Sequence, residues 1–101
     1  MNECQNIMRD VIENAVKSAK CFEIEYKSEW LGFLPFGVYH WVECLGYDFS
    51  NEFPSEWTAA DLHALEKSGF LEKVFEHVSP TDEFDVCRKY RVNLFSNHRL
   101  L

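Results

Sequence analysis

The sequence predicts a single α+β domain built from three helices, a short strand and a C-terminal β-hairpin. Three observations lead to this fold class. The chain has 101 residues, of which 47% are hydrophobic and 27% charged, as is typical of one soluble globular domain. No internal repeat, Gly/Ser linker or low-complexity run divides it. Helical and strand periodicities alternate along its length. We therefore expect one domain over residues 1–101, with a flexible tail at 92–101.

The first helix is predicted over about residues 3–19. Apolar residues recur there every three or four positions on one face, while charged and amide residues take up the other face. Asn2 is a suitable N-cap, and Gln5, three residues later, completes a capping-box pattern. The two signals together predict both the start and the buried side of this helix.

A short strand and a second helix are expected next. Residues 21–27 alternate between apolar and polar types, which is typical of a half-buried strand. The apolar side of this strand consists of Phe22, Ile24 and Tyr26. Four apolar residues then follow at the spacing i, i+3, i+4 and i+7, namely Val38, Trp41, Val42 and Leu45. This spacing predicts a second helix that opens near Pro35 and closes at Gly46.

The third helix has the clearest local signals. Thr58 is the predicted N-cap, and Asp61 three residues later completes a variant of the capping box. Gly69 lies where a C-terminal glycine ends a helix. Two strands, 71–78 and 84–92, are separated by a turn rich in Ser, Pro and Asp, which predicts a β-hairpin.

The order helix, strand, helix, helix, hairpin resembles that of the winged-helix (winged helix-turn-helix) superfamily. The local resemblance lies in Leu62, Leu65-Glu66-Lys67, Gly69, Phe70-Leu71 and Glu72-Lys73, with Lys89-Tyr90-Arg91-Val92 as the return strand. It implies a winged-helix-like fold in which the segment from Thr58 to Val74 is the end of the recognition helix entering the first wing strand. The stretch from Asp48 to Glu66 holds no Lys or Arg, so the resemblance does not extend to a DNA-reading surface.

Charge argues against nucleic acid as the partner. Ten Lys and Arg stand against seventeen Asp and Glu, a net charge of −7, and phosphate groups would be repelled on average. Arg88, Lys89 and Arg91 form the one basic cluster, and a nucleic-acid-binding surface on this strand is an alternative interpretation. Arg88 and Arg91 would point to opposite faces of a strand, where we expect them to compensate Glu72, Glu76 and Asp85.

No residue pattern predicts catalysis, a metal site or a cofactor, so the chain is expected not to be an enzyme. His40 and Cys44 are four apart but have no second ligand pair, and the glycines form no phosphate-binding loop. The four cysteines are interpreted as buried apolar residues of a protein in a reducing compartment. With neither a signal segment nor an apolar run long enough for a membrane span, we expect a cytoplasmic protein without membrane contact.

Aromatic residues are the strongest indication of function. Nine of the sixteen fall within residues 30–57, and large rings with polar tips are enriched at interfaces and in ligand pockets. The predicted binding residues are Trp30, Phe33, Phe36, Tyr39, Trp41, Phe49, Phe53 and Trp57. The leading hypothesis is a small, acidic adaptor domain that binds protein, either itself as a homodimer or another regulator, and its size and charge would suit an accessory protein of a mobile element. The alternative is a module for a small apolar or aromatic ligand.

Overall fold

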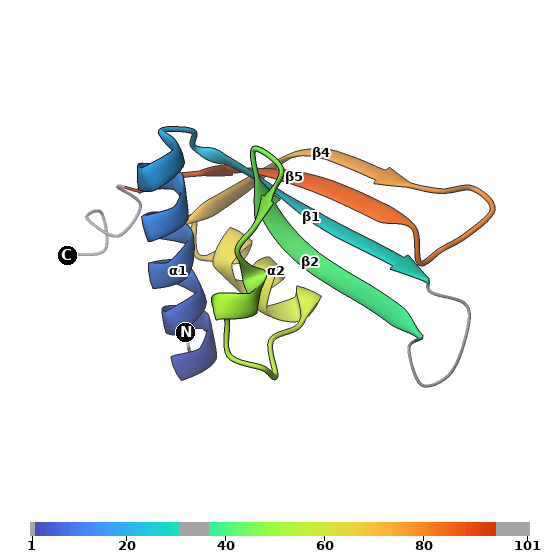
Figure 1. Cartoon of the computed structure of the whole chain (residues 1–101), viewed down its shortest axis with the longest axis horizontal. Coiled ribbons are helices and arrows are strands. Elements are labelled where there is room, and N and C mark those ends of the chain that lie inside the picture. Colours follow the sequence, from blue (N-terminus) through green and yellow to red (C-terminus); the bar gives the residue numbers. More distant parts are fainter. Residues whose placement is uncertain (1, 31–36, 95–101) are drawn as a thin grey trace.

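Two helices cover one face of a five-stranded antiparallel sheet (Figure 1). The computed structural model describes residues 2–30 and 37–94. Its elements are α1 (Glu3–Ala19), β1 (Glu23–Trp30), β2 (Val38–Cys44), β3 (Tyr47–Asp48), the 3-10 turn η1 (Ser50–Glu52), α2 (Ala59–Lys67), β4 (Leu71–Val78) and β5 (Val86–Val92). The strands follow the order β3-β2-β1-β5-β4, so the chain's first strand is the central one.

Alternation along β1 separates the two faces of the sheet. Ile24, Tyr26 and Ser28 are buried on the face that the helices cover. The intervening residues Glu25 and Lys27 lie on the opposite, open face, where Lys27 pairs with Glu25 at 3.7 Å and with Glu43 of β2 at 3.3 Å. Along β1, the open face therefore carries charged side chains in contact with water.

The core lies between the two helices and the face of the sheet that they cover. Its fully buried side chains come from both helices, from β1, β2 and β4, and from the connections around α2. The largest are Phe49, Phe70, Met8, Ile12, Ile24, Leu62, Leu65, Leu71, Val16 and Val42. Helix α1 buries Met8, Ile12 and Val16, as its apolar periodicity predicts.

The N-termini of the two helices are joined through their capping boxes. Asn2 Oδ1 accepts the Gln5 amide at 2.8 Å, and the Gln5 side-chain oxygen accepts the Asn2 amide in return. Gln5 Nε2 also donates to Asp61 Oδ1 at 3.0 Å, while Asp61 Oδ2 accepts the Thr58 amide at 2.9 Å. The predicted caps of the first and last helices are confirmed, and Asp61 additionally connects α2 to α1.

The predicted second helix is wrong, because residues 38–44 form strand β2 paired with β1. Valine and aromatic side chains dominate this segment and favour extended backbone. Val42 and Cys44 face the helices, whereas Tyr39 and Trp41 lie on the open face, so apolar residues occur on both sides of the strand. This two-sided pattern hides the period of two and mimics helical spacing.

The winged-helix resemblance and the three-helix fold class are therefore both wrong. Residues 2–30 and 37–94 contain two α-helices and a sheet in which β1 lies between β2 and β5, an arrangement different from three helices followed by a wing. The C-terminal hairpin is confirmed, with β4 paired to β5. Gly69 has a φ of 90°, which is consistent with the predicted end of α2. The expected tail at 92–101 falls mostly on residues outside the described ranges.

The far ends of both hairpins extend beyond the helical layer. Figure 1 shows the strands β1, β2, β4 and β5 continuing past α2 on the side away from α1. We call this region the distal end and define it as residues 29–30, 38–39 and 78–85. Neither face of the sheet is covered by a helix there, so apolar side chains at the distal end remain accessible.

Candidate functional site

Three of the aromatic residues expected to bind a partner belong to a chain of packed rings. Phe49 and Phe53 meet edge to face at a centroid distance of 5.8 Å, and Phe53 meets Trp57 in the same way at 5.2 Å. Trp57 then stacks on His40 at 4.1 Å. Phe49 and Phe53 are 0% and 6% exposed, so these rings support the fold.

His40 and Tyr26 form a polar pair within this ring chain. A hydrogen bond of 3.2 Å joins Tyr26 Oη and His40 Nδ1. Burial lowers the pKa of the imidazole and raises the pKa of the phenol, so both side chains are held in their neutral forms. The hydrogen-bonded pair joins β1 to β2 inside the ring chain.

The other predicted binding residues that the structure describes lie at or beside the distal end. Trp30 and Tyr39 are 55% and 48% exposed, and Trp41 is partly buried by stacking on Tyr39 at 5.3 Å. Trp30 is paired with Val38, so both lie on the helix side of the sheet. Tyr39 follows Val38 along β2 and therefore faces the open side, as does Trp41. Phe33 and Phe36 lie outside the described residues.

Further exposed apolar residues at the distal end come from the second hairpin. Val78 and Phe84 are 45% and 41% exposed, and Val38 of the first hairpin is 44% exposed. Ser28 Oγ donates to the Phe84 carbonyl at 2.6 Å and so fixes one hairpin against the other. A hollow of about 560 Å³ lies between Trp30 and the segment 78–84.

The charges around these apolar residues are all negative. The distal end contributes Glu29, Asp82, Glu83 and Asp85, and the sequence has no Lys or Arg between residues 28 and 66 or between residues 74 and 87. Asp82 Oδ1 accepts the Phe84 amide at 2.9 Å and shapes the connecting loop. The distal end therefore combines exposed rings with carboxylates.

The basic strand does not form a single cationic surface. Arg88 pairs with Glu76 on the helix side, whereas Arg91 pairs with Glu72 on the open side at 2.9 Å. Lys89 lies over the ring of Phe75 at 5.3 Å. The predicted separation of Arg88 from Arg91 and their pairing with Glu76 and Glu72 are confirmed, and this compensation weakens the attraction for phosphate.

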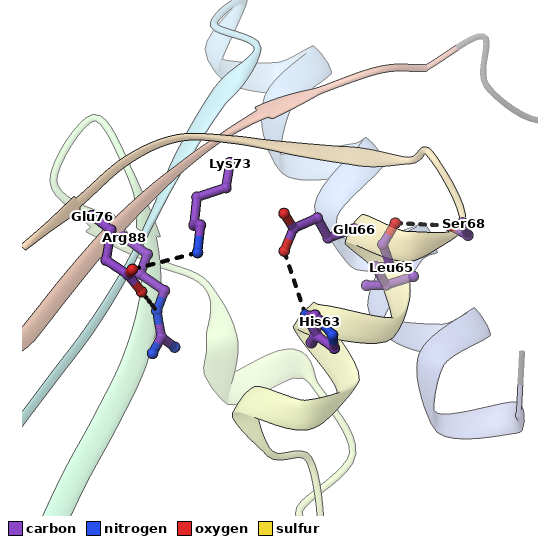
Figure 2. Close-up of polar contacts among 7 residues, drawn as sticks. All are labelled: His63, Leu65, Glu66, Ser68, Lys73, Glu76 and Arg88. Atoms are coloured by element: carbon purple, nitrogen blue, oxygen red, sulfur yellow. Dashed lines mark hydrogen bonds and ion pairs between the residues drawn. The ribbon is translucent and has the colours of Figure 1, made fainter.

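A polar groove of about 410 Å³ lies between α2 and the β4–β5 hairpin. Figure 2 shows its charged side chains. The Glu76 carboxylate forms ion pairs with both Arg88 and Lys73, and His63 Nδ1 lies 3.6 Å from the Glu66 carboxylate. Each cation there faces a carboxylate. No three His, Cys, Asp or Glu side chains converge on a metal-sized site within residues 2–30 and 37–94.

A second groove, of about 520 Å³, lies between α1 and the β2–β3 turn. Cys44 and Phe49 line it together with the exposed side chains of Leu45 and Tyr47. Leu45 has a φ of 51°, an uncommon conformation for a residue with a branched side chain. Cys44 Sγ lies 3.8 Å from the Cys21 carbonyl oxygen, a proximity that the sequence did not indicate.

Comparison of the chain with protein-family models, curated proteins and solved structures finds no match. Neither described helix is long and apolar enough to cross a membrane. The geometry therefore carries the functional argument by itself.

Sequence reasoning did not identify Val38, Val78 and Phe84 as exposed apolar residues of the distal end. Their type resembles that of core residues, and their exposure follows from where the helices end relative to the strands. The acidic turn at residues 82–85 was the available signal, because charged residues next to an apolar strand end indicate a surface position.

Proposed function

We propose that this chain is a protein-binding domain without a catalytic role, and that its interface is the distal end. The observation that carries the proposal is the exposure of apolar side chains on both sides of the sheet at the end without helices. These residues are Trp30, Val38, Tyr39, Val78 and Phe84. Exposed apolar groups gathered in one region and bordered by polar residues are typical of sites of protein contact. We further propose a cytoplasmic location, since all four cysteines are free thiols.

The placement of the rings favours a protein over a small ligand. A small-ligand pocket needs its rings to converge on one concave space. Trp30 lies on the helix side of the sheet and Tyr39 on the open side, so the two rings border different spaces. The distal end has apolar groups on both faces of the sheet, and such a shape fits into a groove on a larger partner.

The charge of the distal end favours a partner with a basic surface. Glu29, Asp82, Glu83 and Asp85 surround the apolar residues, and complementary charge speeds association and suppresses wrong partners. A second copy of this chain, bound through the same end, would bring like carboxylates together. Phosphate groups of DNA or RNA would be repelled for the same reason. We therefore infer a basic protein partner in preference to the expected homodimer.

Site-specific photo-crosslinking in the cells that naturally make the protein tests this proposal. A photoreactive residue replaces Phe84 at the distal end, and a matched control replaces Tyr47, which is 66% exposed in the groove beside α1. We expect a discrete cross-linked protein from position 84 and none from position 47. The cross-linked peptides of that partner should be rich in Lys and Arg, and the yield should fall as salt is raised.

Three outcomes would overturn the proposal. Cross-linking from position 84 to a second copy of the chain would support the homodimer, and cross-linking to nucleic acid would support the basic-strand interpretation. Equal cross-linking from positions 84 and 47 would show that the distal end is not a preferred surface.

A further inference from the structure

Two of the four cysteines lie together where the α1–β1 connection meets the end of β2. The thiols of Cys21 and Cys44 approach the same acceptor, the Glu23 carbonyl oxygen, at 3.9 and 3.5 Å. Cys44 Sγ is also 3.8 Å from the Cys21 carbonyl oxygen. Both are free thiols. The sheet register explains this proximity, because Cys44 comes directly after Glu43, which pairs with Glu25 near the start of β1.

The two thiols differ in their access to solvent. Cys44 is 3% exposed and lies at the wall of the groove beside α1, whereas Cys21 is only partly buried. Burial raises the pKa of the Cys44 thiol, with a further contribution from Cys21. A solvent-borne oxidant therefore reaches Cys21 first, and Cys44 is placed to react second.

The other two cysteines have different neighbours. Cys4 Sγ lies near Met8 Sδ and the Asp61 carboxylate, at 3.9 and 3.8 Å. Cys87 lies on the open face beside Glu25, at 3.7 Å. Within the described residues, neither thiol contacts another cysteine, so Cys4 and Cys87 serve as internal controls for cysteine reactivity.

We propose that Cys21 and Cys44 form a dithiol modification site that closes to an intramolecular disulfide on reaction with hydrogen peroxide. The Cys21 thiolate attacks one peroxide oxygen, the O–O bond breaks, and a sulfenic acid forms as water leaves. The Cys44 thiolate then attacks the Cys21 sulfur, the S–O bond breaks, and a second water leaves. Two thiols lose two electrons and two protons, and hydrogen peroxide is reduced to two waters.

The disulfide would join the α1–β1 connection to the end of β2 and enclose the whole β1–β2 hairpin. Closing this loop restricts the unfolded chain and should raise the thermal midpoint by about 10 °C or more. The dithiol lies beside α1, at the opposite end of β1 and β2 from the distal end, so it is independent of the proposed protein interface.

Peptide mapping after mild oxidation tests the proposal. The folded, reduced protein is treated with hydrogen peroxide, blocked with iodoacetamide and digested with trypsin without reduction. The Lys and Arg positions place the four cysteines in separate peptides, residues 1–9, 21–27, 28–67 and 74–88. Before blocking, we expect an intact mass lower by about 2 Da, and after digestion a linked pair of the peptides 21–27 and 28–67.

Variants separate the proposed pair from general oxidation. The double variant with Cys4→Ser and Cys87→Ser should form the disulfide as fast as the wild type and show the same rise in thermal midpoint. Cys21→Ser and Cys44→Ser should each abolish both effects. Oxidation in urea supplies the unfolded reference, in which all cysteine pairs are expected. If the folded protein gives the same mixture of pairs as the urea sample, or no linkage between 21–27 and 28–67, the proposal is wrong.

Discussion

Leu45 offers a direct test of the backbone at the β2–β3 turn. The residues between the paired Cys44 and Tyr47 are Leu45 and Gly46, with φ values of 51° and 81°. Positive φ at both positions of a two-residue hairpin loop is the type I′ conformation, for which Asn-Gly is the preferred sequence. We therefore predict that Leu45→Asn makes the protein more stable.

The magnitude follows from two opposing contributions. A left-handed conformation costs a residue such as leucine about 1–2 kcal/mol, and asparagine tolerates it better. The Leu45 side chain is 75% exposed, so only about a quarter of the 1.5–3 kcal/mol for full burial, roughly 0.4–0.8 kcal/mol, is lost on its removal. The balance is a gain of about 0.5–1 kcal/mol in the free energy of unfolding.

Urea unfolding followed by circular dichroism measures this difference. Leu45→Asn should raise the urea midpoint without changing the slope of the transition. The matched control Leu45→Ala removes the same apolar contacts but retains the left-handed strain, and it should lower stability slightly. If Leu45→Asn instead lowers the free energy of unfolding by about 1 kcal/mol or more, the side chain packs into the groove beside α1 and the reasoning is wrong.

Three further predictions concern the connections between elements. Asp61→Ala removes the acceptor that joins the capping boxes of α1 and α2, and it should cost about 2 kcal/mol in urea unfolding; an unchanged midpoint would contradict this role. Because burial lowers the pKa of His40 below its ordinary value of 6.5, the unfolded chain binds this proton at higher pH than the folded chain does. The contribution of His40 to the free energy of unfolding is then complete above about pH 6.5 and declines as pH falls toward the lowered pKa. His40→Phe should flatten this decline when unfolding is measured between about pH 7.5 and 5.5. An equal decline in both proteins would assign the pH dependence to other groups. Phe53→Ala should cost about 3–5 kcal/mol and Tyr39→Ala less than half as much, and equal losses in thermal unfolding would place Tyr39 in the core.

Local signals in the sequence were sufficient for the elements whose ends they mark. Asn2 with Gln5 and Thr58 with Asp61 define helix starts through contacts within one turn, and the structure contains both capping boxes. The segment 38–44 has no such mark. Its apolar residues lie on both faces of the sheet: one face of β2 packs on the core, and on the other face Tyr39 stacks on Trp41. This arrangement depends on the pairing of β2 with β1.

The candidate sites depend on contacts that are distant in the sequence. Cys21 and Cys44 come together only when the register of β1 with β2 is known, because their separation along the chain spans the whole hairpin. Phe84 is exposed because the helices end before the hairpins do. Composition predicted a region rich in rings, but the division between the buried Phe49 and the exposed Trp30 follows from the position of the helical layer.

The most direct test of the interface at the distal end uses the partner recovered by cross-linking. The affinity of this partner is measured for two alanine variants of the chain. Trp30→Ala removes the most exposed ring of the distal end, whereas Tyr47→Ala removes a similarly exposed ring beside α1. Titration calorimetry should show an affinity loss of about 30-fold or more for Trp30→Ala, as for a central aromatic anchor, and less than about twofold for Tyr47→Ala. Equal losses, or a larger loss for Tyr47→Ala, would contradict the assignment of the interface to the distal end.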